Sequence, residues 1–99
     1  MQNKYRRFFS HYTFIYPDLF LKNVVVELNN EGRISSVFPF EHEIENTEFY
    51  SGKLFFLPVE ITAISYTQIP AENYRTIDEK IVLEDSVSRI VYNEHGLKL

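Results

Sequence analysis

Three histidines, His11, His42 and His95, are the side chains of this sequence best suited to binding a catalytic metal. A metal site needs several imidazole or carboxylate ligands that converge on one point, and these three lie in separate segments. Glu41 and Glu43 flank His42, but neighbouring residues of an extended chain point in opposite directions and no second histidine follows at i+2 or i+4. We therefore assign no metal site, and we predict an exposed acidic loop around His42, a solvated turn residue at His95 and a partly buried strand residue at His11.

Other catalytic groups lack the neighbours that their chemistry requires. None of the serines lies in a G-x-S-x-G elbow, and the chain has no cysteine. Gly32, Gly52 and Gly96 stand alone, so the sequence has neither a dinucleotide-binding nor a phosphate-binding loop. Glu84 and Asp85 are adjacent carboxylates, which we predict to be exposed at a strand end for solubility. We therefore expect no enzyme activity, no catalytic residues and no cofactor.

The charge of the chain argues against binding to nucleic acid, and its hydropathy pattern argues against insertion in a membrane. Its 99 residues have a formal net charge of −4 and a pI near 5.3, which opposes binding to nucleic acid. Basic residues cluster only at Lys4, Arg6 and Arg7, where we expect a solvated tail. No apolar stretch reaches the roughly 18 residues of a membrane span, and no small-residue cleavage site of a signal peptide follows the interrupted apolar run 8–16. With no cysteine available for disulfides, we expect a cytoplasmic protein that binds neither nucleic acid nor membrane.

Short runs of β-branched and aromatic residues, separated by turn residues, predict a mostly-β chain with one domain over residues 1–99. Residues 29–32 and 93–96 both have the pattern Asn-x-x-Gly, which is typical of hairpin turns. We predict a small two-sheet β-sandwich or flattened barrel, with the acidic stretch 41–48 on the surface and at most one short helix, at 70–79. The expected strands are 8–16, 23–28, 33–38, 48–57, 61–66, 80–84, 88–92 and 97–99.

Alternation of side chains along these strands predicts the hydrophobic core. In the first strand it puts Phe8, Tyr12 and Phe14 on one face and Phe9 and Ile15 on the other. The predicted core consists of Phe14, Ile15, Val24, Val26, Ile34, Val37, Leu54, Phe56, Ile61, Ile64, Val82 and Val91.

Part of the chain is similar to a known family. Residues 22–34, Lys-Asn-Val-Val-Val-Glu-Leu followed by an Asn-rich turn and Gly-Arg-Ile, and residues 48–58, Glu-Phe-Tyr-Ser-Gly-Lys-Leu leading to an apolar stretch and a proline, resemble the opening of metal-dependent amidohydrolases of the cytosine deaminase and imidazolonepropionase type. The resemblance implies a small β-sandwich, the composite domain of those enzymes, with residues 88–99 as its C-terminal hairpin. It implies no reaction here, because Ile64 and Tyr66 stand where the family has its two metal-binding histidines, and these 99 residues hold no catalytic barrel.

Aromatic residues are abundant, with nine phenylalanines and seven tyrosines. Three explanations stay open: the rings fill the core and its rim, an excess marks an interface with another chain, or exposed rings form a platform for a small ligand. We predict a non-catalytic protein-interaction or scaffold module whose partner is another protein or a second copy of the chain. The alternative is a small-ligand binding domain that uses an aromatic face.

Overall fold

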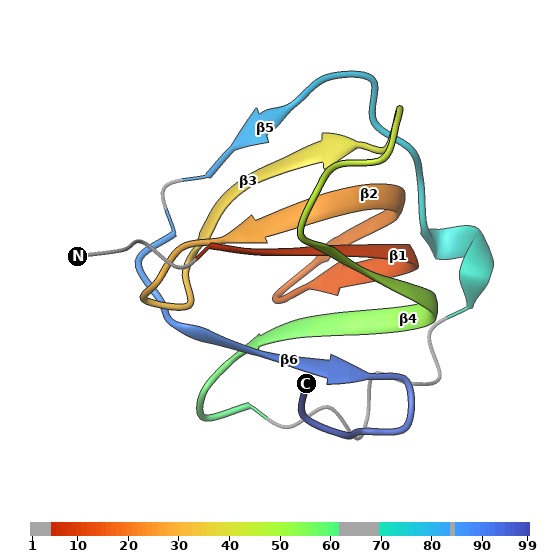
Figure 1. Ribbon diagram of the computed structural model, residues 1–99. Helices are drawn as coiled ribbons and strands as arrows, with labels where there is room; N and C mark the ends of the chain where they lie inside the picture. Colours follow the sequence, from red (N-terminus) through yellow and green to blue (C-terminus); the bar gives the residue numbers. More distant parts are fainter. Residues whose placement is uncertain (1–4, 62–69, 84) are drawn as a thin grey trace.

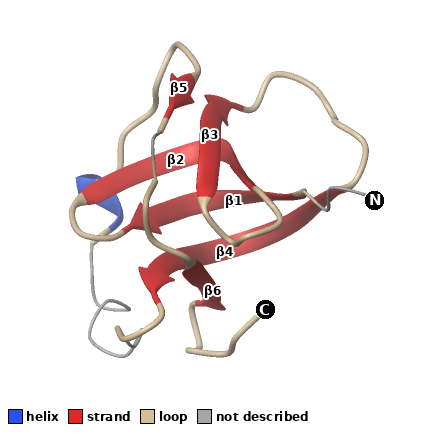
Figure 2. Ribbon diagram, turned by 90° about the vertical axis from the view of Figure 1, so that its left-hand side faces the viewer, coloured by secondary structure: helices blue, strands red, loops and turns tan. Residues whose placement is uncertain are grey.

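The structure of the protein, a computed structural model, describes residues 5–61, 70–83 and 85–99. Six strands form one mixed sheet in the order β5-β3-β2-β1-β4-β6, which Figure 2 shows from β5 at the top to β6 at the bottom. Neighbouring strands are antiparallel except β1 and β4, which run parallel. The predicted mostly-β class is confirmed. The strands are β1 (Arg6–Ile15), β2 (Leu19–Leu28), β3 (Ile34–Pro39), β4 (Thr47–Pro58), β5 (Ile81–Val82) and β6 (Arg89–Asn93).

The sheet bends sharply across its three long strands. β1, β2 and β4 each change direction midway (Figure 1). In β2 the bend falls at Asn23, whose φ of 57° lies in the left-handed region. Ser10 and Tyr12 of β1 are two positions apart, whereas their partners in β4, Tyr50 and Lys53, are three positions apart, which marks a β-bulge. One bent sheet thus takes the place of the two sheets expected for a sandwich, because the hydrogen-bonded ladder of β1 and β2 continues through the bend.

The bend changes which side chains face the core. Phe8 and Ile15 of β1 belong to the same hydrophobic cluster, although strict alternation puts them on opposite faces. The exchange takes place between Ser10 and Thr13, whose buried hydroxyl oxygens lie 2.6 Å apart in a hydrogen bond. The predicted assignment of the two faces of the first strand is therefore wrong beyond the bend, because a local change of backbone direction reverses the alternation.

Two hydrophobic clusters cover the two faces of the bent sheet. The main core takes its buried residues from β1, β2, β3, β4 and β6, and Ile81 of β5 packs against it. The second cluster lies on the opposite face and centres on Phe14, Phe55, Leu57 and Tyr74. Nine of the twelve predicted core residues are buried, namely Phe14, Ile15, Val24, Val26, Ile34, Val37, Leu54, Phe56 and Val91.

The remaining three predicted core residues have different outcomes. The prediction is wrong for Val82, whose side chain is 71% exposed on the edge strand β5. Ile61 is half-buried and packs against the second cluster, and Ile64 lies outside the described residues. Buried residues that the prediction omitted include Phe8, Phe9, Leu21, Val25, Leu28, Phe55, Leu57 and Tyr74.

Both predicted hairpin turns are confirmed, and they are built alike. The amide of Gly32 donates to the carbonyl of Asn29, and that of Gly96 donates to the carbonyl of Asn93, each with an N–O distance of 3.0 Å. Each glycine has a positive φ, of 77° and 81°, which a residue with a Cβ adopts only with strain. In each turn the asparagine Oδ1 also accepts two backbone amides, which holds the loop closed.

The segment after β4 is less regular than predicted. A 3-10 helix, Ala71–Asn73, stands in place of the helix expected over 70–79, because the chain then turns extended and Arg75 forms a parallel bridge to Leu21 beyond the end of β3. The strand expected over 61–66 falls mostly outside the described residues. At the C-terminus, Lys98 forms a single bridge to Tyr92. No helix among the described residues has the length and apolar character needed to cross a membrane.

Candidate functional site

The structure does not bring the three histidines together. His42 is exposed in the loop before β4 and His95 is exposed in the turn after β6, as predicted. His11 is exposed rather than partly buried, because it lies at the bend of β1; its ring contacts Phe9 edge-on at 5.5 Å, and its Nδ1 lies 3.3 Å from Asn23 Oδ1. Within the described residues, no three His, Asp or Glu side chains are grouped so that they could hold a metal ion.

Three phenylalanines, Phe9, Phe40 and Phe49, form a cluster that we name the aromatic patch. The centroid of the Phe9 ring lies 4.8 Å from that of Phe40 and 5.6 Å from that of Phe49, and the last two are 5.9 Å apart. Phe9 forms the floor at 9% exposure, whereas Phe40 and Phe49 are 36% and 47% exposed. The patch therefore presents two large apolar rings to solvent on a buried aromatic base.

Backbone hydrogen bonds position the three residues of the aromatic patch. Phe9 and Phe49 are direct partners in the parallel pairing of β1 and β4. Phe40 follows β3, and its amide donates to the carbonyl of Asn23 at the bend over 3.0 Å. The loop that Phe40 begins passes in front of the sheet in the view of Figure 1. Sequence analysis missed the patch, and the only local signal was an isolated phenylalanine between Pro39 and the acidic stretch.

The loop beside the aromatic patch is acidic. Glu41, Glu43 and Glu45 are all exposed, and none has an ion-pair partner among the described residues. Arg7 lies nearby, but its Nε binds the carboxylate of Glu27 at 2.9 Å and its Nη1 donates to the backbone carbonyl of Glu45 at 3.3 Å. The loop that begins at Phe40 thus carries three glutamates that are exposed and have no ion-pair partner among the described residues.

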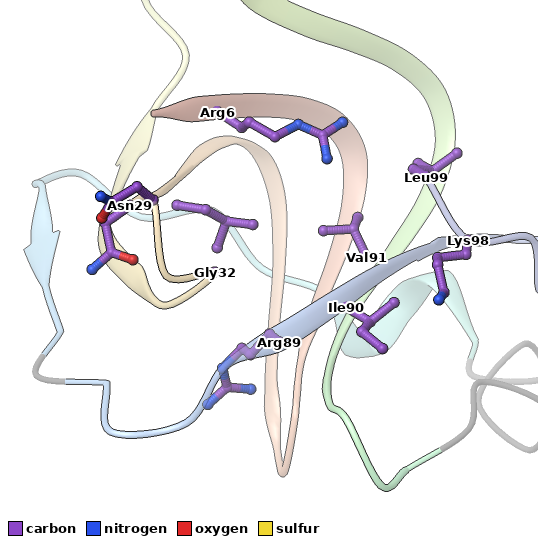
Figure 3. A pocket seen from close by; sticks show the side chains of 10 residues that line it. Arg6, Asn29, Gly32, Arg89, Ile90, Val91, Lys98 and Leu99 are labelled. Carbon is purple, nitrogen blue, oxygen red and sulfur yellow. The ribbon is translucent and has the colours of Figure 1, made fainter. Parts of the chain in front are cut away.

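A cavity of about 500 Å³ opens at the end of the main core (Figure 3). Arg6 reaches over it and is bound to Glu48 by two hydrogen bonds of 3.0 and 3.1 Å, which neutralise its charge. Glu48 also accepts a hydrogen bond from Tyr50 over 2.9 Å, and burial together with this contact raises the pKa of Tyr50, an effect that Arg6 partly offsets. The lining residues are Arg6, Leu28, Asn29, Asn30, Gly32, Arg89, Ile90, Val91, Lys98 and Leu99, with no aromatic ring among them.

Asp85 and Arg89 form a buried ion pair, so the predicted exposed role of Asp85 is wrong. Their side chains are 5% and 10% exposed, and the guanidinium binds both carboxylate oxygens, at 2.8 and 3.1 Å. Arg89 also donates to the carbonyls of Tyr16 and Phe56, at 3.0 and 3.2 Å. Asp85 accepts the amide of Ile34 at 2.9 Å. The pair therefore ties the start of β6 and the segment before it to β3, to β4 and to the turn that follows β1.

Opposing effects act on the pKa of Asp85. Burial raises it, but hydrogen bonds from Arg89 and from the amide of Ile34, together with the charge of Arg89, more than compensate and leave the pKa of Asp85 below its ordinary value. Asp85 is therefore a charged structural group. A second cavity, of about 330 Å³, lies beside the pair and is lined by Ile15, Tyr16, Pro17, Asp18, Leu19, Leu83, Asp85 and Arg89.

Tyr74 carries a buried hydroxyl that has no hydrogen-bond partner among the described residues. Burial raises the pKa of Tyr74 to about 12. We expect Tyr74→Phe to raise the free energy of unfolding by about 1 kcal/mol, because it removes a desolvated polar group and keeps the ring contacts with Tyr12 and Phe20. Urea denaturation at neutral pH measures the effect.

The same substitution tests the pH dependence at Tyr74. Because the folded-state pKa lies above the ordinary value of 10.0, Tyr74 ionises first in the unfolded chain, so stability is unaffected by this group below pH 10 and falls as the pH rises towards about 12. The wild-type protein should therefore lose more stability over this interval than Tyr74→Phe. A destabilised variant, or equal losses in both proteins, would contradict the assignment.

Neither cavity includes a residue of the aromatic patch, so the exposed rings and the two cavities belong to different parts of the surface.

Comparison of the chain with family models, with curated proteins and with solved structures finds no match.

Proposed function

We propose that this protein is a non-catalytic protein-interaction or scaffold module that docks a partner protein through the aromatic patch. The observation that carries the proposal is the exposure of Phe40 and Phe49 against the buried ring of Phe9. Aromatic side chains bury a large apolar area on binding, and they are enriched among the residues that dominate the energy of protein interfaces. The proposal includes a cytoplasmic location, which suits a chain without cysteine.

The scaffold part of the proposal follows the resemblance to the composite domain of amidohydrolases. The Asn-rich hairpin turn at 29–32 and the C-terminal turn at 93–96 are the features of the fold that support it. Ile64 and Tyr66 have no imidazole with which to bind a metal, so the resemblance extends to the scaffold and not to the reaction.

A second candidate function is the binding of a small molecule. The observation that favours it is the cavity of about 500 Å³, whose floor is apolar and whose lining includes the cations of Arg6, Arg89 and Lys98. Two of these cations are already paired with Glu48 and Asp85, which leaves Lys98 to meet an anionic group. The aromatic face envisaged for such a ligand contributes no ring to the cavity.

Binding experiments with a patch variant test the proposal. The wild-type protein and the double variant Phe40→Thr/Phe49→Thr are used as baits in a lysate of the source cells, and any protein retained only by the wild type is purified and titrated calorimetrically. We expect the double variant to weaken that binding at least about tenfold, because it removes both exposed rings. Leu97→Ser is the matched control, since Leu97 is 62% exposed and lies outside the patch.

The outcome that overturns the proposal is equally concrete. It fails if the wild type retains no protein that the double variant loses and also sediments as a monomer at every concentration. Thermal melting of each variant first establishes that the fold is kept.

A further inference from the structure

We propose that the aromatic patch docks a basic segment of a partner protein, in which apolar side chains cover Phe40 and Phe49 while lysine or arginine side chains meet Glu41, Glu43 and Glu45. This inference rests on the proposed function and names the chemistry of the partner. It departs from self-association and from binding of a neutral or acidic protein, both of which the interaction module alone would permit.

The apolar part of the segment is required by the exposed rings. Phe40 and Phe49 lie 5.9 Å apart with their planes at 89°, and they are 36% and 47% exposed, so both rings present apolar surface to whatever covers them. Their base, Phe9, is already closed by the sheet. Covering the exposed parts of the Phe40 and Phe49 rings removes apolar area from water, which favours binding. An exposed aromatic face can also attract a cation.

The basic part of the segment is required by the acidic loop. Glu41 directly follows Phe40, and the backbone of Glu45 is held beside β1 by the hydrogen bond from Arg7. Their charges are unpaired among the described residues, and the chain as a whole carries a net charge of −4. A cationic partner is therefore steered towards the patch, whereas an acidic partner is repelled.

The same charges argue against a second copy as the occupant. A two-fold contact through the patch uses the same surface on both sides, so both copies bring the same acidic loop to the interface. Arg7 does not offset this repulsion, because its guanidinium is held by Glu27 and by the Glu45 carbonyl. A basic segment removes the repulsion and covers the rings at the same time.

Selection of short random peptides displayed on phage tests the inference without a known partner. The wild-type protein is the target, and the peptides it enriches are synthesised and titrated by fluorescence anisotropy at about 0.05 M and about 0.5 M salt. We expect the enriched peptides to combine lysine or arginine with apolar residues, and their affinity to fall at the higher salt.

Two charge variants separate the loop from the overall charge. The triple variant Glu41→Gln/Glu43→Gln/Glu45→Gln should bind the enriched peptides about tenfold more weakly at the lower salt, because it removes the three carboxylates of the loop. The matched control Glu60→Gln/Glu72→Gln/Glu79→Gln changes the net charge by the same amount at exposed positions outside the loop, and it should leave the affinity unchanged.

Each result bears on one of the two proposals. If Phe40→Thr/Phe49→Thr abolishes peptide binding but the loop variant does not weaken it, the basic segment is wrong while the interaction module stands. Enrichment of acidic or uncharged peptides, or equal weakening by the loop variant and its control, also overturns the basic segment. If peptides are enriched equally on the wild type and on the phenylalanine variant, or on neither, both proposals fail.

Discussion

Replacing Arg89 with methionine is expected to lower the free energy of unfolding by about 3–5 kcal/mol, a large part of the total of about 5–15 kcal/mol that is typical of a domain. The substitution leaves the carboxylate of Asp85 buried without its cation, and it removes the hydrogen bonds that the guanidinium donates to the carbonyls of Tyr16 and Phe56. An unpaired charge at 5% exposure cannot be hydrated as it is in the unfolded chain. Urea denaturation of the variant measures the loss.

A double-mutant cycle isolates the ion pair from packing. Asp85→Asn in the Arg89→Met background removes the orphaned charge and keeps an oxygen for the amide of Ile34. The double variant should therefore be more stable than the sum of the two single effects predicts, with a coupling of about 1–3 kcal/mol. Arg6→Met is the control, because Arg6 is 45% exposed in its pair with Glu48 and should lose no more than about 1 kcal/mol. Equal losses at Arg6 and Arg89 would contradict the structural role of the buried pair.

The same pair makes stability depend on acid pH. Because the pKa of Asp85 is lowered in the folded state, its contribution is present above the ordinary value of 3.8 and is lost as the pH falls through the lower folded-state value. Asp85→Asn should therefore show a shallower loss of stability than the wild type below about pH 4. Parallel acid denaturation curves for the two proteins would contradict this expectation.

Phe56→Ala is expected to have an effect of similar size, about 3–5 kcal/mol, through loss of core packing. Phe56 is fully buried, its ring contacts that of Phe8 edge-on at 5.7 Å, and its strand position pairs with Ile15 on one side and Val91 on the other. Truncation removes the ring from the centre of the main core, where the surrounding strands cannot move in to fill the space. The measurement is the midpoint of chemical denaturation.

Val82→Ala is the matched control for that prediction. The side chain of Val82 is 71% exposed on the edge strand β5, so its truncation should change stability by less than about 0.5 kcal/mol. A loss at Val82 as large as that at Phe56 would place the core at the edge of the sheet and contradict the strand order.

The sequence alone determined those features that depend on neighbouring residues. Both Asn-x-x-Gly turns formed where expected, because the asparagine side chain and the glycine conformation act within a few residues. The mostly-β class followed from short β-branched and aromatic runs. Most core positions, such as Val24 and Val26, were also correct, because alternation holds wherever a strand stays straight.

Only the tertiary structure decided the features that depend on distant segments. The bend reverses the alternation in β1, so Phe8 and Ile15 share one core, and this follows from the joint path of three paired strands. The aromatic patch exists because parallel pairing of β1 with β4 sets Phe9 beside Phe49, which local pattern cannot reveal.

Burial of charge was likewise a tertiary outcome. Asp85 follows a short edge strand and is a charged residue of the kind usually found in solvent. Its carboxylate nevertheless binds the guanidinium of Arg89 and the amide of Ile34. Val82, an apolar residue on the edge strand β5, is 71% exposed. A side chain is buried or exposed according to what packs against it from elsewhere in the chain, and the neighbouring residues in the sequence do not predict that partner.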